Sequence, residues 1–309
     1  MSQQSVVQLR NVTKRIGGKT IVDSLSFDVP KGEVFGFLGP NGAGKTTTIR
    51  MMVGLISMSA GEVLVNGLSV NKQFEQAMRH VGAIVENPEL YKFLTGYQNL
   101  IHFARMIPGV TRERIDEVVA LVKLENRIHD KVKTYSLGMR QRLGVAQAIL
   151  HKPDVLILDE PTNGLDPEGI RELRDYLRQL SKEEGTAIIV SSHLLSEMEL
   201  MCDRVAVIQN GKLVDVRPVK DMVAPASGAL EVAFVAEPAE RAAQVVAQAL
   251  PEASVSLQPG GFTAFVGYED IPGLIRALVL ADIRVYGVKA ASKTLEDQFL
   301  EMTRGGQIV

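Results

Sequence analysis

The 309-residue sequence contains one cysteine, Cys202, so an intramolecular disulfide and a cysteine-rich metal site are excluded. It also has no surplus of basic residues, because 34 Lys and Arg accompany 36 Asp and Glu and the net charge is −2. Nucleic-acid-binding proteins usually have a basic surplus, so we expect no nucleic-acid partner. There is no run of about 18 uncharged apolar residues and no basic start followed by an apolar segment. We therefore expect a cytoplasmic chain that reaches a membrane only through another polypeptide.

Hydrophobic residues make up 46% of the chain and charged residues 23%, as in ordinary globular proteins. Short apolar runs typical of strands occur at Val34–Leu38, Val155–Leu158 and Ala187–Val190, and helical patterns lie between them. Residues from about 88 to 150 are mostly helical in pattern. Strands that alternate with helices predict an α/β fold with a largely parallel sheet.

The segment Pro218–Gly228 contains two prolines and a glycine and predicts a domain boundary. We therefore expect one domain at residues 1–219 and a second at 228–309. The second shows the order β-α-β-β-α-β and then a last helix at Leu295–Met302, which fits a small ferredoxin-like α+β unit. Its sequence shows no cluster of residues typical of a catalytic or binding site. We therefore expect an accessory domain that acts in regulation, in dimer support or in neither.

Residues 39–46 match the pattern G-x-x-x-x-G-K-[ST] directly after a predicted strand and at the start of a predicted helix. In such a P-loop, backbone N–H groups surround phosphate oxygens, the lysine reaches the β- and γ-phosphates, and the hydroxyl binds Mg²⁺. The alternative is a glycine-rich turn that binds nothing, but motif and context together favour ATP and Mg²⁺. The residues predicted to bind are Gly39, Asn41, Gly42, Ala43, Gly44, Lys45, Thr46 and Thr47.

Two carboxylates, Asp159 and Glu160, follow the apolar run Val155–Leu158. Ligands in open parallel sheets lie beyond the carboxyl ends of the strands, so both carboxylates should lie near the P-loop. We assign Asp159 to the Mg²⁺ ion, together with Thr46, and Glu160 to general-base catalysis at the γ-phosphate. A solvated strand end would look the same without the P-loop.

Ser136 is a good N-cap for a helix that carries Gly138, and such a helix start is a second possible anion site. Plain helix capping is the competing explanation. The order of P-loop, serine-glycine helix start, Asp-Glu strand and Ser191-Ser192-His193 resembles the ATP-binding subunit of ABC transporters. The resemblance covers about residues 5–217.

This resemblance implies a P-loop NTPase cassette with a RecA-like parallel sheet, an antiparallel β subdomain and a helical subdomain at about 88–150. It implies that Ser136 and Gly138 belong to the signature motif, Asp166 to the D-loop, and that His193 contacts the γ-phosphate. Two cassettes of the family sandwich two ATP molecules head to tail, so a second ATP-binding subunit, identical or paralogous, is expected. A separate transmembrane permease would hold the chain on the inner face of the membrane.

Three positions depart from the family pattern, and one of them is Leu137, which stands where many family signatures have glycine or a polar residue. Glu86 stands where a glutamine is usual, and a carboxylate there can still take a Mg²⁺ or water contact. Together with Asn87-Pro88 and the sequence Y-S-L-G-M, it is similar to the bacitracin-resistance and lantibiotic-immunity branch of exporters. Ile16 stands where an aromatic residue usually stacks on adenine, so it would cover one face of the base without stacking.

Two other functions remain open on the sequence. A soluble ABC ATPase acting on nucleic acid or the ribosome shares these motifs, but usually has tandem cassettes, a coiled-coil insert or zinc cysteines. A regulator that binds ATP without hydrolysis is the other alternative, and Glu160 and His193 argue against it.

Overall fold

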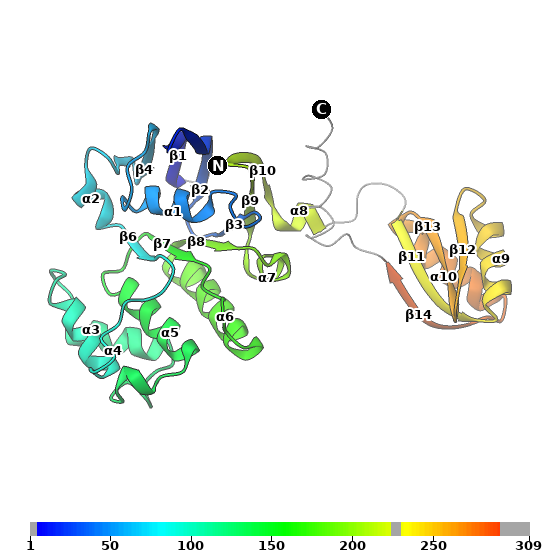
Figure 1. The fold of residues 1–309 in the computed structure, drawn as a ribbon. Coiled ribbons are helices and arrows are strands. Elements are labelled where there is room, and N and C mark those ends of the chain that lie inside the picture. The colour runs from blue at the N-terminus through cyan, green and yellow to red at the C-terminus, as the bar shows by residue number, and fades with distance from the viewer. Residues whose placement is uncertain (1–4, 224–229, 291–309) are drawn as a thin grey trace. The chain divides into compact units, whose positions relative to one another are not determined.

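The computed structural model describes residues 5–223 and 230–290 of the chain (Figure 1). These residues form two compact units that divide between Val219 and Lys220. The helix expected at Leu295–Met302 lies outside the described residues.

The first unit contains an antiparallel sheet with the strand order β2-β1-β4-β5. Buried and exposed residues alternate over Leu25–Val29 of β2, as in a strand with one covered face. Its strands are β1 (Ser5–Ile16), β2 (Lys19–Pro30), β4 (Ala60–Val65) and β5 (Leu68–Ser69).

The second sheet of this unit has six strands in the order β10-β9-β3-β8-β7-β6. All its pairs are parallel except β9–β10, so the expectation of a largely parallel sheet is confirmed. Every residue of β3, β7 and β8 is buried, which explains their continuous apolar runs. The strands are β3 (Val34–Leu38), β6 (Val81–Ile84), β7 (Val155–Asp159), β8 (Ala187–Ser192), β9 (Arg204–Gln209) and β10 (Lys212–Pro218).

Side-chain caps set the start of several helices. Thr95 forms a capping box, and Thr111, Ser136 and Asp166 each accept a hydrogen bond from the backbone N–H three residues on. The helices of the first unit are α1 (Lys45–Met52), α2 (Phe74–Met78), α3 (Gly96–Ala104), α4 (Arg112–Leu121), η1 (Val132–Thr134), α5 (Leu137–Ala148), α6 (Pro167–Glu184) and α7 (Leu195–Met201). The five-residue α8 (Val219–Val223) follows β10.

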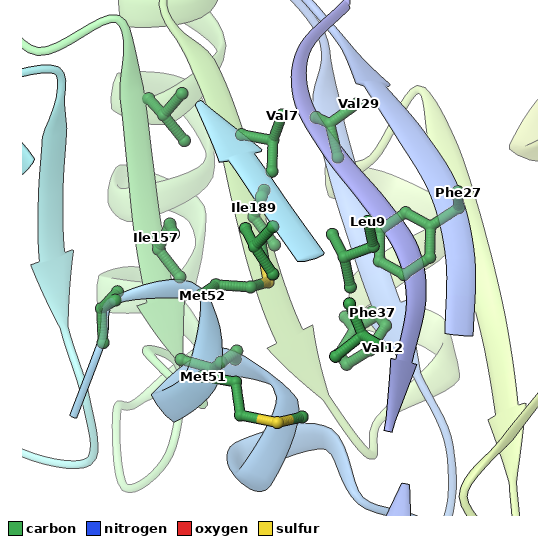
Figure 2. Packing of buried hydrophobic residues seen from close by; sticks show 14 of the residues in the cluster. Val7, Leu9, Val12, Phe27, Val29, Phe37, Met51, Met52, Ile157 and Ile189 are labelled. Carbon is green, nitrogen blue, oxygen red and sulfur yellow. The ribbon is translucent and has the colours of Figure 1, made fainter. Parts of the chain in front are cut away.

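The main apolar core lies where the two sheets and α1 meet (Figure 2). Val7 and Leu9 of β1 contribute to it from the antiparallel sheet, and Ile157 and Ile189 from the parallel sheet. Met52 belongs to α1, the helix that follows the P-loop. Full burial of one such side chain contributes about 1.5–3 kcal/mol, so this packing holds α1 firmly beside the strand ends.

The second unit is a four-stranded antiparallel sheet in the order β12-β13-β11-β14, with two helices. Phe234 and Phe262 stack in its core with ring centroids 4.8 Å apart, and Leu274 and Leu278 of α10 are buried in the same cluster. Val235 lies on the opposite face of β11 from Phe234 and is half exposed. The elements are β11 (Leu230–Glu237), α9 (Ala239–Ala249), β12 (Ser254–Gln258), β13 (Gly261–Val266), η2 (Tyr268–Asp270), α10 (Ile271–Leu280) and β14 (Arg284–Ala290).

Candidate nucleotide-binding site

The P-loop joins the end of β3 to the start of α1, and glycine is required at two of its positions. A Cβ added at Gly39 would overlap the carbonyl oxygen of Ile208 on β9, and Gly44 has φ +103°, which disfavours L side chains. The turn after β9 also holds the loop, because Gly211 donates its backbone N–H to the carbonyl oxygen of Ala43 at 3.0 Å. The loop is therefore a backbone cradle whose shape is set by its neighbours.

Lys45 is buried, with a side chain that is only 6% exposed. Its Nζ donates to the carbonyl oxygen of Gly39 at 2.7 Å and lies 3.7 Å from Oε1 of Glu160. Burial lowers the pKa of Lys45, while the nearby carboxylates of Glu160 and Asp159 oppose that shift. A buried cation of this kind favours an anionic ligand in front of it.

Asp159 lies at the carboxyl end of β7 and is held by hydroxyl groups. Its Oδ1 accepts from Ser191 Oγ at 2.6 Å and from Thr46 Oγ1 at 3.4 Å. Ser191 Oγ also accepts the backbone N–H of Glu160 at 2.9 Å. One hydroxyl on β8 therefore positions both carboxylate residues, a role that the sequence analysis did not assign to Ser191.

Glu160 has its carboxylate between Lys45 and His193. Its Oε2 lies 2.8 Å from Nδ1 of His193, which follows β8, and its backbone has φ +49°. The two residues predicted to be catalytic are thus brought together with the P-loop lysine. A cavity of about 530 Å³ opens onto them and is lined by Ile21, Asn41, Gly42, Ala43, Gly44, Lys45, Thr46, Thr47, Glu160, Asn163 and His193.

Three residues predicted to bind ATP lie elsewhere, in a cavity of about 420 Å³. It is lined by Ser136 and Gly138 at the start of α5 and by Asp166, the N-cap of α6, and it contains no P-loop residue. Ile16 is 52% exposed at the end of β1 and lines neither cavity, whereas Ile21 of β2 lines the first.

Glu86 follows β6 with φ +68° and forms an ion pair with Arg50 of α1. It lines a third cavity of about 230 Å³, which also contains Thr46, Asp159 and Glu160. Glu86 therefore lies near the predicted metal position, and Arg50 offsets the charge that this carboxylate adds. No local sequence pattern indicates that ion pair.

The residues present fit a Mg²⁺ ion bound with a nucleotide. Mg²⁺ is usually held by one or two carboxylates, waters and substrate phosphates, rather than by an all-protein cage. No group of three or more His, Cys, Asp or Glu side chains suited to a metal occurs in residues 5–223 and 230–290. Thr46 and Asp159 would supply a hydroxyl and a carboxylate oxygen, which lie 3.4 Å apart. The fold and the site define a P-loop nucleotide hydrolase.

The family model described as "ABC transporter" matches residues 22–163. The chain is 59% identical to the uncharacterized ABC transporter ATP-binding protein YhcH of Bacillus subtilis strain 168, over 97% of this chain and 96% of that protein. It is 37% identical to the bacitracin transport ATP-binding protein BcrA of Bacillus licheniformis, over 98% of this chain and 99% of that protein. A solved structure of an ATP-binding subunit of an ABC transporter matches 71% of this chain and 92% of its own, with 28% identity and a TM-score of 0.64.

The chain therefore belongs to the ATP-binding proteins of ABC transporters, which are ATPases coupled to transport, and the family resemblance is confirmed. Among the helices in the described part of the chain, none has the length and apolar character needed to cross a membrane.

Proposed function

We propose that this chain is the ATP-hydrolysing subunit of an exporter whose cargo is a drug, an antibiotic peptide or a lipid-like molecule. The main support is the nearly full-length match to a bacitracin transport ATP-binding protein. A separate permease would bind the cargo and hold the chain at the inner face of the membrane. Cargo choice would then depend on the permease rather than on any cavity described above.

In this proposal the P-loop binds the triphosphate, and Lys45 contacts the β- and γ-phosphates. Thr46 and Asp159 would hold Mg²⁺, which would neutralise charge on the phosphate oxygens when bound. Glu160 accepts a proton from the attacking water as the water oxygen bonds to the γ-phosphorus and the bond to the β-phosphate oxygen breaks. ADP and phosphate leave. His193, 2.8 Å from Glu160, orients that carboxylate and contacts the γ-phosphate.

The two separate cavities support a head-to-tail dimer. The cavity at Ser136 contains no P-loop residue, and neither Ser136 nor Gly138 lines the P-loop cavity of its own chain. A second copy, identical or paralogous, would place its Ser136 and Gly138 against the γ-phosphate. The nucleotide then joins the two subunits, and hydrolysis releases them.

The position of Glu160 between Lys45 and His193 is the observation that carries the hydrolytic step of this function. Replacing Glu160 with Gln should lower steady-state ATP hydrolysis by at least about 100-fold, because the base is lost while the shape is kept. The variant should form dimers with ATP in size-exclusion chromatography. Glu252→Gln in the second unit, at an exposed residue, is the matched control and should hydrolyse ATP at the wild-type rate. Full turnover by Glu160→Gln, or a monomer in ATP, would contradict the proposal.

A further inference from the structure

Gln141, in the second turn of α5, is a buried residue whose amide lines two cavities and makes no hydrogen bond to the residues that the structure describes. Its relative exposure is only 4%. A glutamine side chain offers one oxygen acceptor and two N–H donors. Because Gln141 lines two cavities, this hydrogen-bonding capacity is available to a molecule bound in one of them.

The amide lies on the wall of the 230 Å³ cavity that also contains Thr46, Asp159 and Glu160. These residues come from α1 and the end of β7, whereas Gln141 comes from α5. Gln141 also lines the cavity at Ser136, so it belongs to the wall between the two cavities. The 230 Å³ cavity is lined by three carboxylates, of Glu86, Asp159 and Glu160, and an uncharged donor on its wall can approach a phosphate without adding further negative charge.

We propose that Gln141 donates an amide N–H to the terminal phosphate of the ATP bound at the P-loop of its own chain. This inference rests on the proposed function. Helix α5 would then contact both nucleotides of the dimer. Ser136 at its start would contact the nucleotide bound by the partner subunit, and Gln141 would contact the nucleotide bound by its own chain. The signature end of the helix would thus respond to whether the chain's own site holds ATP or ADP, since ADP lacks the phosphate that Gln141 contacts.

The test compares two nucleotides on the full-length chain, at protein concentrations where light scattering shows a monomer. Dissociation constants are measured with Mg²⁺ for ADP and for the non-hydrolysable ATP analogue AMP-PNP. Gln141→Leu keeps a similar volume and removes the amide. It should bind AMP-PNP about tenfold more weakly, equivalent to about 1.4 kcal/mol, and ADP with less than about a twofold change. Gln147→Leu, in the same helix and lining neither cavity, should leave both constants unchanged.

An unchanged ratio of the two constants in Gln141→Leu, or an equal loss for both nucleotides, would overturn the inference. So would a variant that binds both normally as a monomer but fails to dimerise, because Gln141 would then serve the partner's nucleotide. Failure of the wild-type chain to bind either nucleotide would instead overturn the proposed function. If Gln141→Leu does not fold, Gln141→Glu keeps the length and adds negative charge. It should then weaken AMP-PNP binding more than ADP binding, and equal effects would count against the inference.

Discussion

Residues 5–219 bury polar and charged side chains beside the parallel sheet, among them Lys45, Asp159 and Ser191, whereas residues 230–290 bury apolar side chains alone. Burying a polar group costs free energy unless it has a partner, so such groups concentrate where chemistry needs them. The second unit has the kind of core that serves stability, with stacked Phe234 and Phe262 at its centre. The comparison indicates that the ATPase chemistry belongs to the first unit and that any role of the second acts through its surface.

The largest expected effect concerns the second unit. Phe234→Ala should lower its free energy of unfolding by about 3–5 kcal/mol, because Phe234 is 1% exposed and would leave a cavity. Calorimetry of the full chain measures this loss. Phe265→Ala, at a residue that is 47% exposed, should change it by about 0.5 kcal/mol or less. ATP hydrolysis should persist in both variants; its loss with Phe234→Ala would show that the first unit depends on the second.

An intermediate effect should follow from Ser191→Ala in the first unit. Asp159 and the backbone N–H of Glu160 both lose a hydrogen bond, and bonds to charged groups contribute about 1.5–3 kcal/mol. We expect hydrolysis to fall roughly 10- to 100-fold, while ATP affinity changes little. Ser191→Thr keeps the oxygen and should restore most of the rate in a steady-state assay. If Ser191→Ala hydrolyses ATP at the wild-type rate, the buried polar side chains of the first unit do not identify it as the catalytic unit.

The smallest effect is a pH dependence that should be larger in the first unit than in the second. Burial lowers the pKa of His151, whose Nε2 contacts the carbonyl oxygen of Val81 at 3.1 Å and whose Nδ1 is buried without a partner. The unfolded chain therefore takes up the proton first, near pH 6.5. Stability from this residue is present above about pH 6.5 and lost as the pH falls, by at most about 1.4 kcal/mol down to pH 5.5.

Calorimetry at pH 7.5 and 5.5 checks this dependence. His151→Gln should reduce the pH dependence of the unfolding transition of the first unit. Residues 230–290 contain no histidine, so the unfolding temperature of the second unit should shift less between the two pH values. An equal shift of both transitions would show that histidine burial does not distinguish the units.

The sequence predicted the parts of the site that depend on local motifs. Lys45, Asp159, Glu160 and His193 come together because each lies at the carboxyl end of a parallel strand, in the loop after it or at the start of the helix that follows, and those strand ends share one edge of the sheet. The buried runs of β3, β7 and β8 were recognisable for the same reason.

Contacts between distant elements could not be predicted in this way. The ion pair of Glu86 with Arg50 and the burial of Gln141 arise from packing, and neither residue shows it in its local pattern. Ser191 was visible as part of a strand end, but one serine among many gives no sign that its hydroxyl joins two carboxylate residues. The strands β9 and β10 were also not predicted, although β9 pairs directly with β3.

The contact of β9 with the P-loop has a practical consequence for any shortened version of the protein. Ile208 and Gly211 carry no reactive group, yet they form one wall of the phosphate cradle through Gly39 and Ala43. A fragment that ends after His193 would retain every motif and lose that wall. The smallest piece able to bind nucleotide therefore extends through Gly211, past the last residue that takes part in the chemistry.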